Sequence, residues 1–160
     1  MPRPVRGFTL IELMVVVAII GILASMSLPN MADRVIRQQV QEIVGFSEFA
    51  RDAVQVFFLK TRRLPHNNAE AGLPPADKIV GNYVAGVEIE DGVVSIKLGN
   101  RVNRSVDGKW LSIRPGLSPQ YGQVPISWAC GTAEGVAGLS YAGRNRTDLK
   151  PEYLPIDCRM

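Results

Sequence analysis

The sequence predicts an α+β fold in which a long N-terminal helix packs on a four-stranded antiparallel sheet. Three observations support this prediction. Residues 8–28 form an almost unbroken apolar run, residues 31–60 repeat apolar side chains every three or four positions, and residues 79–130 contain four short segments typical of strands. A chain of 160 residues, 46% hydrophobic and 21% charged, has room for one folded domain with an appendage.

The apolar run at residues 8–28 is long enough to cross a membrane. A helix of this length rises roughly 31 Å, close to the hydrocarbon thickness of a bilayer. A cleaved secretory signal, with its cleavage site near residues 24–27, is one alternative, and a plain single-pass anchor is another. Five residues of the run fall outside the hydrophobic set: Thr9, Glu12, Gly21, Ser25 and Ser27.

An amphipathic helix is predicted over residues 31–60, so that one long helix has a membrane-like first half and a packed second half. Gly21 and Pro29 are the candidate points at which this helix loosens, because proline removes a backbone donor. An ordinary glycine and proline of a membrane helix are the alternative. The apolar positions that carry the period are Val35, Ile36, Val40, Ile43, Val44, Phe46, Ala50, Ala53, Val54, Phe57 and Phe58.

The sheet is predicted from four segments with strand patterns. Residues 83–90 and 93–98 alternate and are rich in Val and Ile, and Asp91-Gly92 between them favours a two-residue hairpin turn. Residues 110–114 and 126–130 supply two more strands. Residues 61–78 lack periodicity and predict a loop, in which His66 is expected to be exposed and inert.

The composition argues against several function classes. The chain has 18 Lys and Arg against 15 Asp and Glu, a formal charge of +3, which permits contact with nucleic acid or anionic lipid without requiring it. One His and two Cys are too few ligands for a zinc cluster. A nucleophile elbow and a phosphate-binding Gly-Lys-Ser/Thr loop are missing. We therefore expect no enzyme activity, no cofactor and no metal.

The residues in front of the apolar run have a specific layout. Residues 1–7, MPRPVRG, form a short basic leader that ends in Gly7, and FTLIEL follows directly. Here the sequence resembles the type IV pilins, bacterial filament subunits that are made as prepilins. The resemblance implies cleavage by prepilin peptidase between Gly7 and Phe8, followed by N-methylation of Phe8. Arg3 and Arg6 favour a cytoplasmic N-terminus, which places the residues after the apolar run outside the inner membrane.

Glu12 is the candidate assembly residue. A carboxylate costs roughly 2.5–3.5 kcal/mol near the centre of an inserted helix, and less near its end, where Glu12 lies. The resemblance implies that the Glu12 carboxylate pairs with the new amine of Phe8 in a neighbouring subunit, which would set the register of stacked helices. Snorkelling of Glu12 to the membrane surface, without a further role, is the alternative.

The C-terminal end extends the resemblance to pilins of the type IVa class, which carry a W-x-C pattern and close on Leu-Pro-x-x-Cys-Arg. This chain has WAC at residues 128–130 and YLPIDCR at residues 153–159. Cys130 and Cys158 are its only cysteines, and a disulfide between them is expected in the oxidising periplasm, with two free thiols as the alternative. In the family, the loop closed in this way is variable, exposed and used for receptor contact.

A basic segment between the predicted strands is a candidate contact with DNA or another surface. It contains Arg101, Arg104, Lys109 and Arg114, with Trp110 available for stacking. Related competence pilins bind DNA through basic surface strips, and such binding depends strongly on salt. A solvated segment that keeps the edge of the sheet soluble is the favoured alternative.

The predicted organisation has a leader peptide at residues 1–7, a transmembrane or filament-core helix at 8–28 and a head at 29–160. The head comprises an amphipathic helix at 29–60, the sheet at 79–130 and a C-terminal disulfide loop at 130–158. The expected function is that of a structural subunit, the major pilin, of a type IVa pilus that supports adhesion, twitching motility and DNA uptake. A minor or competence pilin, a type II secretion pseudopilin and a single-pass membrane sensor are the alternatives.

The expected partners are further copies of the chain, the prepilin peptidase and methylase, the inner-membrane assembly platform and minor pilins. A host receptor and DNA are further candidate partners. Before assembly the chain would lie in the inner membrane with its head in the periplasm, and after assembly it would lie in a pilus on the cell surface.

Overall fold

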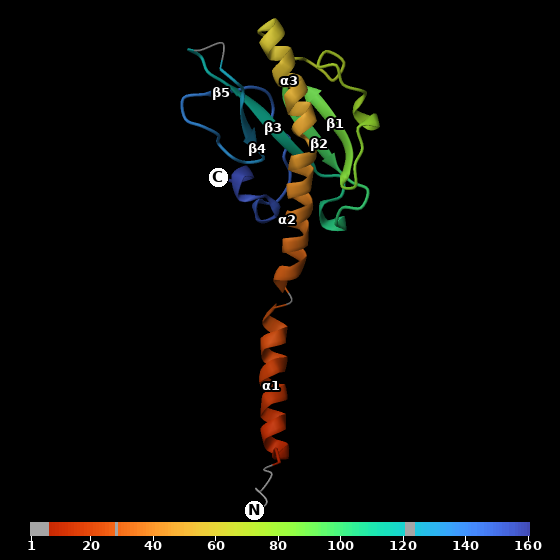
Figure 1. Cartoon of the computed structure of the whole chain (residues 1–160), viewed down its shortest axis with the longest axis vertical. Helices are drawn as coiled ribbons and strands as arrows, with labels where there is room; N and C mark the ends of the chain where they lie inside the picture. The colour runs from red at the N-terminus through yellow and green to blue at the C-terminus, as the bar shows by residue number, and fades with distance from the viewer. Residues whose placement is uncertain (1–6, 28, 121–123) are drawn as a thin grey trace, which may run out of the picture. The chain divides into compact units, whose positions relative to one another are not determined.

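The computed structural model describes residues 7–27, 29–120 and 124–160, which divide into two compact units, residues 1–34 and 35–160. Helix α1 (Leu10–Ser27) lies in the first unit (Figure 1). Its side chains at residues 10–26 are exposed on every face. It belongs to the one helical stretch among the described residues that is apolar and long enough to cross a membrane. The predicted leader residues Arg3 and Arg6, and Leu28, lie outside the described residues.

Helices α2 (Pro29–Phe46) and α3 (Glu48–Thr61) present one apolar stripe to the core of the second unit, as predicted. The buried positions follow one another at three or four residues, which keeps them on one face of a 3.6-residue helix. Val35, expected in the core, is instead 46% exposed. The buried positions are Ile36, Val40, Ile43, Ser47, Ala50, Val54 and Phe58.

The predicted helix is interrupted at Ser47, which is fully buried between α2 and α3. The Ser47 hydroxyl donates to the Val44 carbonyl at 2.7 Å, and the Ser47 N–H is shared between the carbonyls of Ile43 (3.1 Å) and Val44 (3.3 Å). A serine that bonds back to the preceding turn competes with the regular ladder of the helix. The stripe of buried side chains continues across this break.

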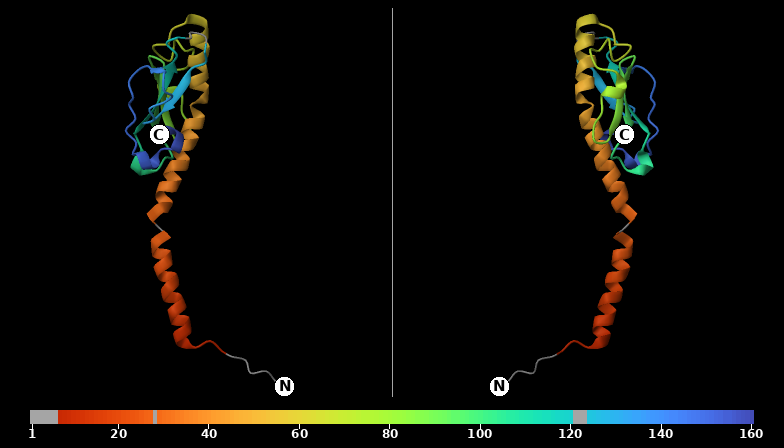
Figure 2. Two further views of the ribbon diagram at one scale, coloured as in Figure 1. Left: turned by 90° about the vertical axis from the view of Figure 1, so that its left-hand side faces the viewer. Right: turned by 90° about the vertical axis from the view of Figure 1, so that its right-hand side faces the viewer.

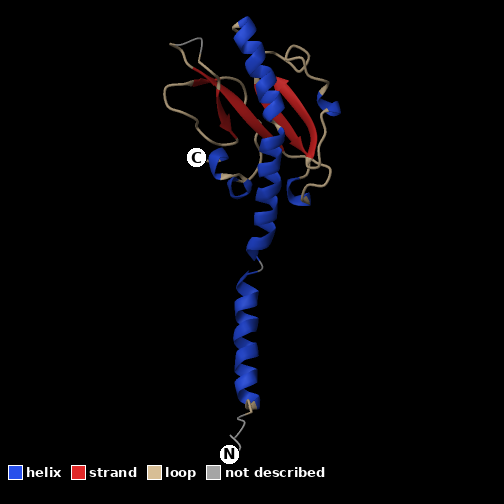
Figure 3. Ribbon diagram, viewed as in Figure 1, coloured by secondary structure: helices blue, strands red, loops and turns tan. Residues whose placement is uncertain are grey.

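The antiparallel sheet has the order β1-β2-β3-β4, with β1 (Val84–Glu90), β2 (Val93–Leu98), β3 (Trp110–Leu117) and β4 (Ser127–Cys130) (Figures 1 and 3). The four predicted strands are confirmed. Asp91 and Gly92 form the predicted turn, with φ of 48° and 80°. A short fifth strand, β5 (Ser140–Tyr141), pairs with β3 and was not predicted. Short 3₁₀ turns occupy Ala76–Lys78, Arg104–Val106, Pro151–Tyr153 and Ile156–Cys158.

One face of the sheet packs on α2 and α3 and makes the core. Every second residue of the strands points to this face, since side chains alternate across a strand. The members are fully or almost fully buried aliphatic side chains: Val87 and Ile89 of β1, Val94, Ile96 and Leu98 of β2, and Leu111 and Ile113 of β3. The helix and the sheet therefore bury each other's apolar surface.

The opposite face of the sheet is covered by the C-terminal segment (Figure 2). Residues 143–148 cross over β2 and β3, where Arg146 donates its N–H to the Ser112 hydroxyl at 3.0 Å. The hydroxyls of Ser95 and Ser112 lie 3.1 Å apart and are buried. Because these polar groups satisfy one another, they can be buried without a large desolvation cost.

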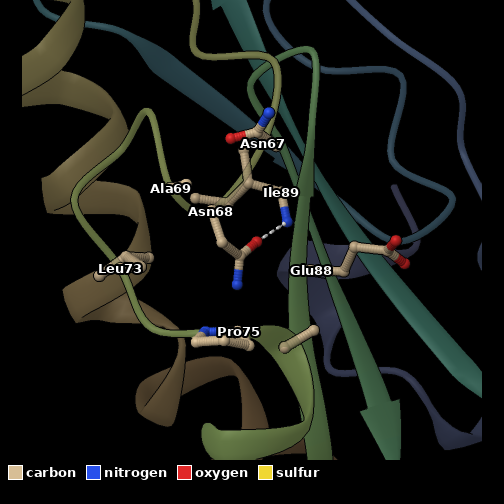
Figure 4. Close-up of a pocket in the computed structure, with 8 residues that line it drawn as sticks. Asn67, Asn68, Ala69, Leu73, Pro75, Glu88 and Ile89 are labelled. Carbon is tan, nitrogen blue, oxygen red and sulfur yellow. Dashed lines mark hydrogen bonds between the residues drawn. The ribbon is translucent and has the colours of Figure 1, made fainter.

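The loop between α3 and β1 covers the outer edge of β1. The Asn68 side chain donates to the carbonyls of Val87 and Pro74, each at 2.9 Å, and accepts the N–H of Ile89 at 2.6 Å. An unpaired edge strand offers its backbone to other chains. Asn68 therefore takes the place of a neighbouring strand at this edge (Figure 4).

The carboxylates of Glu70 and Asp91 stabilise the same loop through hydrogen bonds and ion pairs. Glu70 accepts hydrogen bonds from the Arg63 guanidinium at 2.6 Å and the His66 N–H at 3.0 Å, and these two contacts hold the pKa of Glu70 below its ordinary value. His66 is exposed, as predicted, but its Nδ1 lies 2.6 Å from Oδ1 of Asp91 in the hairpin turn. The loop is thus joined to the turn between β1 and β2.

Replacing Asn68 by alanine is expected to destabilise the head by about 1–3 kcal/mol, because the buried backbone groups of Val87 and Ile89 lose their partner. Denaturant unfolding of the full chain in detergent micelles would measure this loss. The exposed Asn82 is the matched control, and its alanine variant should unfold within about 0.5 kcal/mol of the parent. Equal stability of the two variants would contradict the role given to Asn68.

Candidate functional site

The described residues contain no group of three or more His, Cys, Asp or Glu side chains arranged to hold a metal ion. The candidate functional regions are therefore the N-terminal motif and the surfaces of the head.

Gly7 and Phe8 lie in front of α1 without secondary structure. Both are exposed, Phe8 to 80%, and a side chain added at Gly7 would meet no atom within 4 Å. A linking peptide of this kind is open to a processing enzyme. The geometry also leaves space on the protein side for residues other than glycine, so any requirement for Gly7 would come from the enzyme.

Thr9 and Glu12 form reciprocal hydrogen bonds at the start of α1. The Glu12 carboxylate accepts from the Thr9 hydroxyl at 3.4 Å and the Thr9 N–H at 3.5 Å, and the Glu12 N–H donates to the Thr9 hydroxyl at 3.4 Å. This is a capping box, in which a threonine and a glutamate three residues later satisfy free N–H groups of the first turn. Glu12 also places negative charge at the positive end of the helix dipole.

Cys130 and Cys158 form the predicted disulfide. Cys130 ends β4, Cys158 lies in the last 3₁₀ turn, and both are buried. Gly131 follows with φ of 60°, and a side chain there would come within 2.5 Å of the Cys158 carbonyl oxygen. That oxygen also accepts the N–H of Thr132 at 2.8 Å. The covalent link therefore sits inside a tight backbone crossing that only glycine permits.

Tyr141 fixes the loop between the cysteines to the sheet and was not predicted. Its ring lies against Gly116 and Gly135, where any side chain would overlap it. Its hydroxyl accepts the Val136 N–H at 2.7 Å. The only signal in the sequence was a lone tyrosine in a glycine-rich stretch, which gives no indication of its contacts.

The four basic residues predicted to contact DNA have different surroundings. Arg101 and Arg104 are exposed between β2 and β3. Lys109 lies 3.5 Å from the Asp148 carboxylate, and Arg114 donates to the Ala133 carbonyl at 2.8 Å. Two of the four cations are therefore engaged within the head, and the contact with DNA stays a prediction.

Trp110 carries a cation on its ring that sequence reasoning missed. The Arg146 guanidinium carbon lies 3.9 Å from the ring centroid, and the same guanidinium bonds to the Glu88 carboxylate at 2.6 Å. Arg146 thus joins the C-terminal segment to β3 and β1 across the sheet. The ring face under Arg146 is covered, so it is not open for stacking with a base.

A cavity of about 380 Å³ lies between the loop and β1, lined by Asn67, Asn68, Leu73, Pro75 and Glu88 among others (Figure 4). Asn68 is its most buried polar side chain, and both its amide nitrogen and its amide oxygen are hydrogen-bonded to backbone groups. In Figure 4, Glu88 points away from Asn68. The polar groups here hold the fold together rather than converge on a ligand.

Two family models match the chain. The pilin model, which describes bacterial filament proteins, matches residues 37–159, and the model of the prokaryotic N-terminal methylation motif matches residues 2–28. The chain belongs to the pilin family. The first match covers the packed unit of this pilin, and the second covers most of the predicted leader, the capping box and α1.

The pilin is also similar to named relatives over nearly its whole length. It is 38% identical over 161 residues to the type IV major pilin protein PilE1 of Neisseria gonorrhoeae, which covers 96% of the chain and 87% of the relative. It is 36% identical to a fimbrial protein of Neisseria meningitidis serogroup B, covering 96% and 94%. The fimbrial protein EcpC of Eikenella corrodens is 33% identical, covering 96% and 90%.

Replacing either cysteine of this pilin by serine is expected to lower the free energy of unfolding by on the order of 3–4 kcal/mol, because the 28-residue separation no longer restricts the unfolded chain. Denaturant unfolding of Cys130→Ser, Cys158→Ser and the double variant would measure the loss. All three should agree with the reduced parent. Unchanged midpoints in the single variants would contradict a stabilising disulfide.

Proposed function

We propose that this chain is the structural subunit of a type IVa pilus and serves there as the major pilin. The observation that carries the proposal is the co-linear similarity, over 96% of the chain, to proteins named as type IV major pilins. The methylation motif at residues 2–28 and the pilin match at 37–159 lie in one chain, which supports a subunit that assembles with copies of itself.

In this proposal, residues 1–7 are a leader that prepilin peptidase removes, and the new N-terminus at Phe8 is methylated. The open peptide around Gly7 and the match to the methylation motif support this step. Residues 8–28 then anchor the subunit in the inner membrane, with the head of residues 29–160 in the periplasm. An assembly platform and minor pilins would transfer the subunit into a pilus on the cell surface.

The proposed contact between subunits joins the Phe8 amine of one copy to the Glu12 carboxylate of another. Glu12 is exposed, and its carboxylate already lies at the N-terminal end of α1 within the capping box. A charge moved into an apolar filament core needs a partner, because an unpaired buried charge is costly. The pair would therefore favour one axial register between neighbouring helices.

Adhesion, twitching motility and DNA uptake are the proposed roles of the assembled pilus. A minor or competence pilin of the same machinery is the second candidate, and copy number separates it from a major pilin. The disulfide between Cys130 and Cys158 argues against a type II secretion pseudopilin, because pseudopilins usually lack the C-terminal cysteine pair.

Mass spectrometry of filaments sheared from the cell surface tests the major-pilin proposal. The expected result is that this chain is the dominant species, that it begins at Phe8 and that its N-terminal amine carries a methyl group. A chain present only in trace amounts among other pilins would overturn the major-pilin role. A chain that still begins at Met1 would overturn the proposed processing.

Replacing Glu12 by valine is expected to abolish filaments while leaving cleavage after Gly7 intact, because the Phe8 amine loses its counter-charge. The yield of sheared filaments and the mass of the cell-associated subunit would be measured together. Glu134→Val, at an exposed carboxylate of the head, is the control and should assemble normally. Normal filament yield from Glu12→Val would rule out the proposed contact.

A further inference from the structure

A second cavity, of about 280 Å³, lies on the face of the sheet opposite α3. Ile96 and Leu98 of β2 point into the core, so Lys97 between them points to the opposite face, where it is the cross-strand neighbour of Trp110. Asp77, Gly86 and Glu88 complete the polar and backbone lining. An indole ring, two carboxylates and an ammonium group thus converge on one small hollow.

The walls of this cavity are held in place by the C-terminal segment. The backbone N–H of Trp110 donates to the Asp148 carboxylate at 2.6 Å, and the Trp110 carbonyl accepts the backbone N–H of Asp148 at 3.2 Å. Arg146 covers one part of the ring but is not among the residues that line the cavity, so the ring meets the cavity on a side that Arg146 leaves uncovered. A rigid site loses little conformational entropy when it binds a ligand.

Among the described residues, the charges in the cavity leave one cation, Lys97, without an ion-pair partner. Glu88 is paired with Arg146 at 2.6 Å, and Asp77 is paired with Lys78 at 3.2 Å. Lys97 is exposed and makes no ion pair within the described part of the chain, and its Nζ lies 6.0 Å from the Trp110 ring centroid. A ligand with one negative charge would neutralise the charge of Lys97.

We propose that this cavity binds a single acidic sugar residue, such as a uronic acid. The apolar face of the pyranose ring packs on the Trp110 indole, its hydroxyls donate to the carboxylates of Asp77 and Glu88, and its own carboxylate accepts from the Lys97 ammonium. Aromatic rings provide a rigid apolar platform, and the charge-assisted bond supplies the preference for an acid. A free phosphate ion has no apolar ring face to pack on Trp110, so it lacks one of the two contacts that the site offers to an acidic sugar.

Titration of sugars into the ¹⁵N-labelled full chain tests this site by NMR, in amine-oxide micelles whose headgroups carry no sugar. Glucuronic acid should shift the indole N–H resonance of Trp110 and leave that of Trp128 in place. Glucose should bind about tenfold more weakly, because it lacks the carboxylate. Inorganic phosphate should leave the Trp110 resonance unchanged.

Lys97→Gln should remove the preference for glucuronic acid over glucose, while Lys60→Gln, at an exposed lysine of α3 outside the cavity, should keep it. Trp110→Phe retains an aromatic wall and should weaken both sugars, with the dispersion of the spectrum showing that the head is folded. An absent shift with glucuronic acid, an equal shift with phosphate, or a stronger shift with a single-stranded oligonucleotide would each overturn the proposal.

Discussion

The structure of the head depends on the mutual burial of one helix stripe and one face of the sheet. Aliphatic side chains from three strands of the sheet pack against the helix stripe. The stripe consists of Ile36, Val40, Ile43, Ala50, Val54 and Phe58. A slip of one residue in a strand would turn its aliphatic set away from the helix, so this contact also fixes the register of the hairpins.

The opposite face of the sheet is stabilised by a different kind of chemistry. Instead of aliphatic packing, it uses a hydroxyl pair between Ser95 and Ser112, a guanidinium stacked on Trp110 and an ion pair to Glu88. These directional contacts hold a segment that has little secondary structure of its own. The disulfide and the crossing at Gly131 hold the two ends of the loop together, so the segment is positioned from several sides at once.

The sequence predicted those parts of the fold that depend on local patterns. The helix stripe and the four longer strands show their period within a few residues, and the turn is marked by the dipeptide Asp91-Gly92. β5 was missed because two residues cannot show a period, and the break at Ser47 because a serine inside an apolar stripe has no local sign of back-bonding.

The candidate sites follow the same rule. Asn68, Tyr141 and Arg146 make contacts that are distant in the sequence, and no spacing reveals such contacts. Thr9 and Glu12 are different, since their three-residue spacing before an apolar run is the sign of a capping box and was available in the sequence. The disulfide was predicted because the chain has only two cysteines and its ends resemble a known family.

The apolar surface of α1 on every face has a consequence for the energetics of the proposed assembly. A helix that moves from a bilayer into a bundle of like helices leaves one apolar environment for another. The hydrophobic effect therefore contributes almost nothing to the free energy of this transfer. The difference in free energy must come from close packing, from a few polar contacts and from the heads. Small changes in those terms would then be enough to turn net growth of a filament into net loss of subunits.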